Sequence, residues 1–175
     1  MRDAVIVSTA RTPIGKAYRG ALNATTPQRL AAHVIEHAIE RAGIEAGEVE
    51  DVILGVAMQQ GFQGGNFARQ SALRAGLPIS VAGMTLDRQC SSGMMAIATD
   101  AKQVIHDGIS IAIGGGVEST SLVRTEEMRS DKDPWLAAQR TSIYMSMIET
   151  AEMVAERYKV PREAQVTCFP KSGPL

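Results

Sequence analysis

Residues 81–108, VAGMTLDRQCSSGMMAIATDAKQVIHDG, indicate the fold class most clearly. The stretch opens with an apolar, strand-like run, Val81–Leu86, and passes through a short polar turn that contains Cys90. It then continues as a helical segment with an apolar stripe, which Gly108 ends. A strand, a turn and an amphipathic helix in this order are typical of proteins that alternate strands and helices.

The same alternation extends along the chain on both sides of this stretch. A helix over residues 27–42 is predicted because Thr26 provides an N-cap, Pro27 occupies the first helical position and Gly43 stops the helix. Asn66 similarly caps a helix over residues 67–75. The predicted strands are Ala4–Ser8, Asp51–Val56, Val81–Leu86 and Ile109–Ile113. Since these strands are apolar on both faces, we predict an α/β fold with a mainly parallel sheet and helices on both faces.

The texture of the sequence changes after about Ser119. Residues 122–139 are polar and carry no long periodic signal, whereas residues 144–158 have the pattern of a helix. Residues 166–175 contain two prolines and no periodicity, and are too short to predict an element of their own.

Composition excludes several classes of function. The chain of 175 residues has 18 Lys and Arg against 19 Asp and Glu, and no block of like charge indicates a nucleic-acid or membrane-surface partner. No apolar run approaches the ~20 residues that a membrane helix needs, and no secretion signal is recognisable at the N-terminus. Cys90 and Cys168 predict neither a disulfide framework nor a zinc site. A reduced, cytoplasmic setting is therefore expected.

Cys90 is the candidate nucleophile. A thiol at a helix N-terminus meets free backbone N–H groups and the positive end of the helix dipole, and both favour the thiolate. Such a thiolate is suited to covalent catalysis. The alternative is a buried structural cysteine, because free cysteine is among the most buried residue types.

Four ordered motifs extend this interpretation. They are VIVSTARTPIG at residues 5–15, QCSSG at 89–93, GGGVES at 114–119 and ETAE at 149–152. In order and spacing the chain resembles the N-terminal part of a thiolase, an enzyme that makes and breaks 3-ketoacyl-CoA thioesters. The resemblance implies an N-terminal α/β domain over residues 1–118, a partial loop domain over 119–165 and an unrelated tail over 166–175.

The resemblance also implies a mechanism. Cys90 would attack the carbonyl carbon of an acyl-CoA and hold the acyl group, and its backbone N–H would be one donor to the developing oxyanion. Met147 would line the acyl pocket, although ordinary packing of a Met-rich helix is an equally good interpretation. No cofactor is implied beyond coenzyme A thioesters as substrates. Thiolases are oligomers, so a homo-oligomer is expected.

Three departures from the family pattern stand out. Asp87 occupies a position where thiolases usually have Asn, and a carboxylate there opposes thiolate formation unless a neighbour such as Arg88 neutralises it. Ser146 stands where many biosynthetic members have His. Thiolases are longer, and their second half supplies a histidine, a second cysteine and an Asn-containing loop. Without those partners we expect turnover close to background.

Two alternatives remain open at this point. A ketoacyl synthase shares the fold and uses a nucleophilic cysteine, but the Arg11–Gly15 opening and the Glu118-Ser119 pair favour a thiolase. The second alternative is a non-catalytic fragment that binds CoA or associates with a longer subunit.

The remaining motifs are interpreted structurally. His33 and His37 match the pattern H-x-x-E-H of some zinc proteases, but they lie opposite the apolar stripe of their helix and are expected to face water. No metal site is predicted. The glycines at 61, 64, 65 and 114–116 do not form a dinucleotide-binding pattern, and tight turns are expected there. Cys168 is expected to be incidental.

Overall fold

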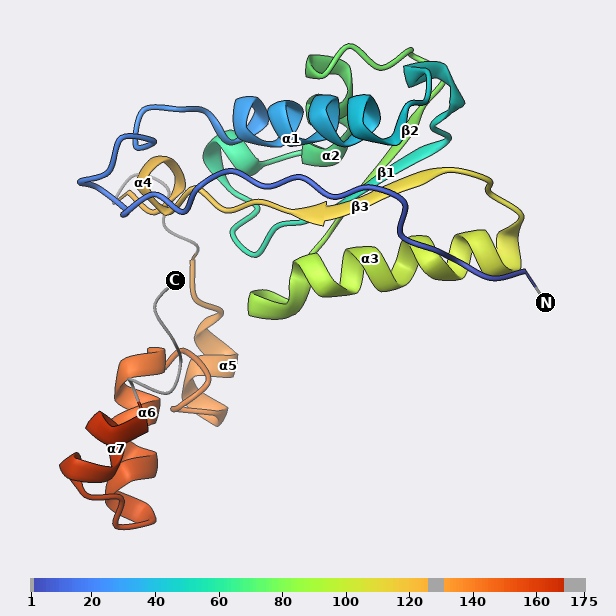
Figure 1. Ribbon diagram of the computed structural model, residues 1–175. Helices are drawn as coiled ribbons and strands as arrows, with labels where there is room; N and C mark the ends of the chain where they lie inside the picture. The colour runs from blue at the N-terminus through green and yellow to red at the C-terminus, as the bar shows by residue number, and fades with distance from the viewer. Residues whose placement is uncertain (1, 126–130, 169–175) are drawn as a thin grey trace. The chain divides into compact units, whose positions relative to one another are not determined.

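The computed structural model describes residues 2–125 and 131–168, and the chain divides into two units, Met1–Arg129 and Ser130–Leu175. The first unit holds a three-stranded parallel sheet in the order β2-β1-β3. Its strands are β1 (Asp51–Gly55), β2 (Ala82–Leu86) and β3 (Ala112–Gly116). Helices lie on both faces of this sheet (Figure 1), which confirms the predicted α/β class.

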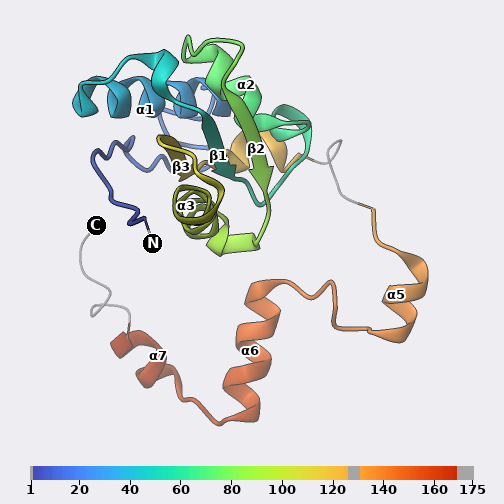
Figure 2. The ribbon, with the colours of Figure 1, turned by 90° about the vertical axis from the view of Figure 1, so that its right-hand side faces the viewer.

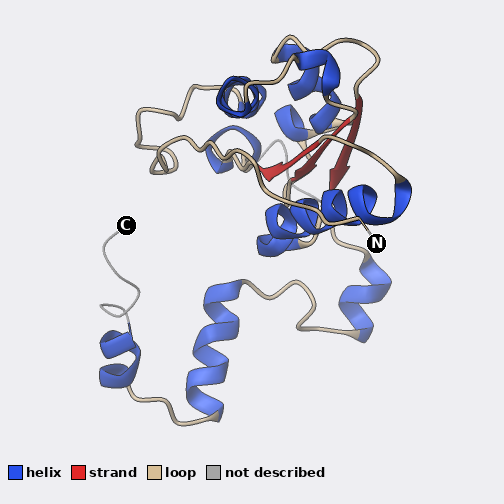
Figure 3. Cartoon of the chain, turned by 45° about the vertical axis from the view of Figure 1, so that its right-hand side comes forward, coloured by secondary structure: helices blue, strands red, loops and turns tan. Residues whose placement is uncertain are grey.

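Three helices make the layers of the first unit. Helices α1 (Pro27–Ala42) and α2 (Phe67–Arg74) cover one face, and α3 (Ser92–Lys102) lies on the other face against β1 and β3 (Figures 1 and 2). The shorter elements are η1 (Ala46–Glu48), η2 (Gly61–Gln63), η3 (Gln89–Ser91), η4 (Gln103–Asp107) and α4 (Thr120–Val123). Figure 3 shows the three strands enclosed between these helices.

The core explains why β1 is the central strand. All five of its residues are buried, and Val52 and Leu54 belong to one apolar cluster with Ile35 of α1, Phe67 of α2 and Val81. A strand that is covered on both faces needs a continuous apolar run, which is what the sequence of β1 supplies. The predicted start and end of α1 are also confirmed, because Pro27 begins the helix and Gly43 ends it with φ at +67°.

The predicted strand at residues 4–8 is wrong. This segment runs beside β3 without regular structure (Figure 1), and no backbone hydrogen bond involving residues 4–8 occurs within the described part of the chain. Val5, Ile6 and Val7 are each about three-quarters exposed, at 76%, 76% and 74%. A strand needs a ladder of hydrogen bonds as well as apolar side chains, and no strand pairs with this segment.

The last strand of the sheet lies three residues later than predicted. The sequence favours residues 109–113, where the β-branched isoleucines are, but β3 spans Ala112–Gly116 and pairs in parallel with β1. Asp51 is aligned with Ala112 and Gly55 with Gly116. The three glycines are thus part of the strand, and the expectation of a tight turn at 114–116 is also wrong. By contrast, Gly61 and Gly65 have φ values of +52° and +70°, as tight turns require.

The second unit contains three helices, α5 (Pro134–Gln139), α6 (Met147–Arg157) and α7 (Arg162–Cys168). Helix α6 confirms the helix predicted over 144–158, and Ser146 and Glu149 form a capping box at its start. These hydrogen bonds from Ser146 lower the pKa of the Glu149 carboxyl. No residue of 131–167 is buried, so these residues form no apolar core of their own.

Helix α4 belongs to the first unit. Its Val123 is buried, and the Val123 carbonyl accepts a hydrogen bond from the Gln60 side chain at 2.5 Å. Residues 166–168 of the expected tail belong to α7, and residues 169–175 lie outside the described residues. No helix in the described ranges is long and apolar enough to cross a bilayer.

Candidate active site

The candidate nucleophile lies in the turn that joins β2 to α3. Cys90 is the middle residue of η3, and it is exposed and unpaired. Gln89 has φ at +50°, a left-handed conformation that costs free energy in a non-glycine residue. Such strain persists only where the surroundings hold it, so the contacts of this turn decide where Cys90 points.

Asp87 holds the strained residue of the turn. Its Oδ1 accepts a hydrogen bond from the backbone N–H of Gln89 at 2.7 Å, in the manner of an Asx turn. From the sequence, Arg88 is a candidate to neutralise Asp87. Instead, the Arg88 guanidinium lies 3.5 Å from the sulfur of Met95, and no ion pair between Arg88 and Asp87 occurs within the described part of the chain. The Asp87 side chain is therefore hydrogen-bonded within the turn and is not paired with Arg88.

Ser92 closes the turn from its other side. This side chain is buried, and its Oγ accepts a hydrogen bond from the backbone N–H of Arg88 at 2.8 Å and donates one to the carbonyl of Gln89 at 2.6 Å. Ser91 adds an exposed hydrogen bond to the carbonyl of Arg88 at 2.9 Å. Residues on both sides of Cys90 are thus fixed by hydrogen bonds, and Cys90 lies in η3, immediately before α3.

Glycines in the sheet allow α3 to begin there. A Cβ added at Gly55 of β1 would lie 2.1 Å from the carbonyl carbon of Ser92, and one added at Gly116 of β3 would lie 2.9 Å from the Cα of Gly93. Real Cβ atoms do not approach backbone atoms this closely, so both positions require glycine. We call Gly55, Gly116 and Gly93 the glycine seat. The seat places Cys90 at the carboxyl ends of the parallel strands, where α/β proteins bind their ligands.

At the same carboxyl ends of the strands, a group of hydrogen bonds connects the loop after β3 to the loop after β1. Glu118, which follows β3, accepts hydrogen bonds from the backbone N–H groups of Ala57 and Met58 at 3.0 and 3.3 Å, in the loop after β1. The buried Gln63 side chain donates to Glu118 and to the carbonyl of Met58, and its Oε1 accepts from the N–H of Ser119 at 2.6 Å. Gln63 was not predicted as a buried residue. In the sequence it is only one polar residue among neighbouring glycines.

The described residues offer a candidate nucleophile, Cys90, but no acid or base partner for it. Within the described part of the chain, no side chain makes a hydrogen bond or ion pair with the thiol of Cys90. The thiol can therefore meet an electrophile from solvent, but no described residue is placed to accept or return its proton.

Met147, the other predicted site residue, is the first residue of α6 and is 76% exposed. It belongs to the second unit, whereas Cys90 belongs to the first. An exposed methionine next to a helix N-cap is compatible with both interpretations from the sequence, so its role in the acyl pocket stays a prediction.

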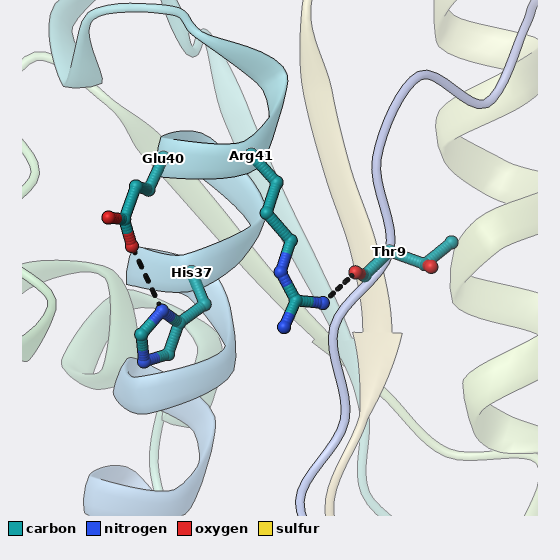
Figure 4. Close-up of polar contacts among 4 residues, drawn as sticks. All are labelled: Thr9, His37, Glu40 and Arg41. Atoms are coloured by element: carbon teal, nitrogen blue, oxygen red, sulfur yellow. Dashed lines mark hydrogen bonds and ion pairs between the residues drawn. The ribbon is translucent and has the colours of Figure 1, made fainter.

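The histidine pair lies on the outer side of α1, as predicted. His37 Nδ1 is 3.0 Å from Glu40 Oε2, and its ring meets that of His33 edge-on with centroids 4.5 Å apart. The His37 side chain is 43% exposed and His33 is also exposed. Figure 4 shows His37 and Glu40 near Arg41, whose guanidinium donates a hydrogen bond to the carbonyl of Thr9 at 2.7 Å. Within residues 2–125 and 131–168, no three His, Cys, Asp or Glu side chains are grouped to hold a metal ion.

Comparisons with known proteins agree with this geometry. Residues 4–168 match the family "Thiolase, N-terminal domain". The chain is 42% identical to a 3-ketoacyl-CoA thiolase of Bacillus subtilis over 165 residues, which are 94% of this chain and 42% of that protein. It is 35% identical to an acetyl-CoA acetyltransferase of Pseudomonas aeruginosa, covering 94% of this chain and 44% of that protein.

A solved structure extends the similarity to three dimensions. The crystal structure of the Bacillus anthracis acetyl-CoA acetyltransferase matches with a TM-score of 0.75 at 37% identity, over 93% of this chain and 44% of that one. The chain thus spans less than half the length of the relatives it matches. The family match covers most of the chain, so this protein belongs to the thiolase family and carries its N-terminal domain.

Proposed function

We propose that this protein exchanges acyl groups between acyl-CoA thioesters through an acyl-enzyme on Cys90. The thiolate attacks the thioester carbonyl carbon, a new S–C bond forms, and the C–S bond to coenzyme A breaks as its thiolate leaves and takes up a proton. An acetyl-CoA that has lost a proton from its methyl carbon then takes the acyl group by forming a C–C bond, which releases the Cys90 thiolate. Thiolysis is the reverse reaction.

The observation that carries this proposal is the position of Cys90. It is an exposed thiol in a turn held by Asp87 and Ser92, at the start of a helix that rests on the glycine seat. The backbone N–H groups that begin α3 are suited to stabilise both a thiolate and an oxyanion. The relatives named as 3-ketoacyl-CoA thiolase and acetyl-CoA acetyltransferase indicate the substrate class.

We further propose that residues 1–175 alone are catalytically incomplete. Cys90 has no acid or base partner among the described residues, and the family resemblance assigns these partners to the second half of a thiolase. Loss of residues that act together with a nucleophile commonly costs orders of magnitude in rate. The chain is expected to be acylated slowly at Cys90 and to turn over close to background.

Mass spectrometry of the intact protein after incubation with acetyl-CoA tests the nucleophile. We expect one acetyl group, located on Cys90 by peptide mapping and absent from Cys90→Ser. The matched control is Cys168→Ser, which should be labelled like the wild type. Labelling that persists in Cys90→Ser would refute the assignment, and near-normal thiolysis of acetoacetyl-CoA by the wild type would refute the incompleteness.

A non-catalytic fragment that binds CoA is the second candidate, because the thiol has no partner among the described residues. Binding of CoA without any labelling of Cys90 would favour it. A ketoacyl synthase is disfavoured because the matched family is that of the thiolases, and transfer from an acyl-carrier protein in preference to acyl-CoA would be needed to revive it.

Three finer features are part of the proposal. Met147 lines the acyl pocket, the reaction uses no cofactor beyond its CoA substrates, and the protein acts as a cytoplasmic homo-oligomer. The edge strand β2 supports association, since one side of it is unpaired within the described residues and open strands tend to pair. Sedimentation of the purified chain tests the oligomer, and a purely monomeric species would contradict it.

A further inference from the structure

A second buried polar cluster lies at the amino-terminal end of β1, whereas Cys90 lies near the carboxyl ends of the strands. Asp51 begins β1, Asp100 is in the last turn of α3, and Gln103 begins η4, which continues α3 as a π-helical turn. Asp51 and Asp100 are only 7% and 6% exposed. This cluster belongs to neither the nucleophile turn nor the loop connection at Glu118.

The cluster holds more acceptor oxygens than donors. Asp51 Oδ2 accepts one hydrogen bond, from Gln103 Nε2 at 3.1 Å. The other oxygens, Asp51 Oδ1, both carboxyl oxygens of Asp100 and Gln103 Oε1, are buried and have no partner within the described part of the chain. Buried carboxylates are normally paired with a cation or with several N–H groups, because an ionised carboxylate in apolar surroundings is very unfavourable.

The backbone around Asp100 leaves little room for another group. A Cβ added at Gly114 of β3 would lie 2.1 Å from Asp100 Oδ2 and 2.8 Å from the Cα of Ile97. The Asp100 carboxyl therefore lies directly against the strand. The change from α- to π-helix at Gln103 occurs immediately after this contact, and such changes often mark places where a helix is under local constraint.

We propose that the cluster of Asp51, Asp100 and Gln103 is a proton-controlled joint: α3 stays seated on β1 and β3 at this end while Asp100 carries a proton, and ionisation of Asp100 opens η4 to water. A protonated carboxyl is neutral and can donate a hydrogen bond to a neighbouring acceptor. An ionised one would place a second negative charge beside Asp51 without a cation to balance it.

The charges around the joint agree with this mechanism. Burial, and secondarily the negative charge of Asp51, raise the pKa of the Asp100 carboxyl to about 7. Asp100 faces Asp51 of β1 and Gly114 of β3, and the neutral Gln103 of η4 is hydrogen-bonded to Asp51. Ionisation in the folded state is therefore expected near neutral pH, where an exposed aspartate is already fully ionised.

Amide hydrogen exchange of η4 at about pH 6 and about pH 8, corrected for the intrinsic rate, tests the joint. We expect protection of residues 103–107 to fall about tenfold or more in the wild type. It should stay constant in Asp100→Asn, which keeps the shape but cannot ionise. Asp107→Asn removes an exposed carboxyl from the same turn and should behave like the wild type. Equal loss of protection in the wild type and Asp100→Asn would overturn the proposal.

Carbon-13 NMR of the Asp100 carboxyl provides a test that does not depend on how the variants fold. A titration midpoint near neutral pH supports the joint, and a midpoint in the ordinary acidic range overturns it. Magnesium added at about pH 8 distinguishes a proton from a cation, since recovery of protection in η4 would show that the oxygens bind a hard cation and would also overturn the proposal.

Discussion

The two ends of α3 contact the same sheet but differ in which polar groups they bury and which they expose. At its first turn, the polar atoms around Cys90 are hydrogen-bonded while the thiol itself is exposed. At its last turn, the carboxyls of Asp51 and Asp100 are buried and three of their four oxygens are unpaired. Both ends approach the strands closely because glycines, Gly55 and Gly116 at one end and Gly114 at the other, remove side chains from the contact. Close contact between α3 and the sheet thus leaves the Cys90 thiol exposed at one end of the helix and buries the carboxyls of Asp51 and Asp100 at the other.

The largest effect is expected at the buried end, as a dependence of stability on pH. The pKa of Asp100 is raised in the folded state, so the folded state binds its proton more tightly than the unfolded state. The resulting stability is fully present below about pH 4 and is lost as the pH rises to about 7, by as much as about 4 kcal/mol in the free energy of unfolding. Urea unfolding across this range measures it. Asp100→Asn should remove the decline, and an unchanged decline in that variant would contradict the assignment.

The next effect is expected at the glycine seat. Gly55→Ala places a Cβ against the backbone of Ser92, and α3 must move away, which should cost about 3 kcal/mol of stability. The matched control is Gly115→Ala in β3, where the nearest atom would be Leu54 Cδ2 at an ordinary 3.6 Å. Urea unfolding compares the two variants. Similar stabilities for both would show that the start of α3 is not held by this contact.

A smaller effect is expected in the turn itself. Ser92→Ala removes the hydroxyl that contacts the N–H of Arg88, the carbonyl of Gln89 and Asp87 Oδ1, and it leaves the N–H of Arg88 without its acceptor. We therefore expect a loss of about 1–2 kcal/mol in the free energy of unfolding. Ser91→Ala removes only an exposed hydrogen bond and should cost less than about 0.5 kcal/mol. The rate of Cys90 alkylation by iodoacetamide should change in Ser92→Ala more than in Ser91→Ala. A larger change in the alkylation rate for Ser91→Ala than for Ser92→Ala would show that Ser91, and not Ser92, positions Cys90.

The smallest effect is expected on the outer face of α1, away from both ends of α3. His37→Ala breaks an exposed pair with Glu40 and should change the free energy of unfolding by less than about 0.5 kcal/mol. Zinc should not raise the melting temperature of the wild type, because the described residues offer no third ligand. A zinc-dependent rise that His37→Ala abolishes would show that the H-x-x-E-H pattern binds metal after all.

Sequence reasoning succeeded where the signal is local. Thr26, Pro27 and Gly43 predict both ends of α1 because capping depends on residues within one turn of the helix. The continuous apolar run of β1 predicts a central buried strand. The turn with Cys90 between β2 and α3 was also predicted, since strand and helix periodicities change on either side of it.

The predictions were wrong where a segment distant in the sequence determines whether a strand forms. Residues 4–8 have the composition of a strand, yet no strand pairs with them, and β3 begins three residues later than its isoleucines indicate. Both errors have one cause, since a strand forms only with a partner strand, and that partner is often distant in the sequence. Gln63 was overlooked for a related reason, because its role appears only when Glu118 folds back onto it.

Residue order and local periodicity were enough to predict the α/β alternation, the resemblance to thiolases and Cys90 as the candidate nucleophile. Only the tertiary structure decided that Gly114–Gly116 form a strand under α3, that Asp87 is held by the turn, and that Asp51 and Asp100 share one buried site. Close packing and desolvation depend on which surfaces meet, and residues far apart in the chain meet only after folding.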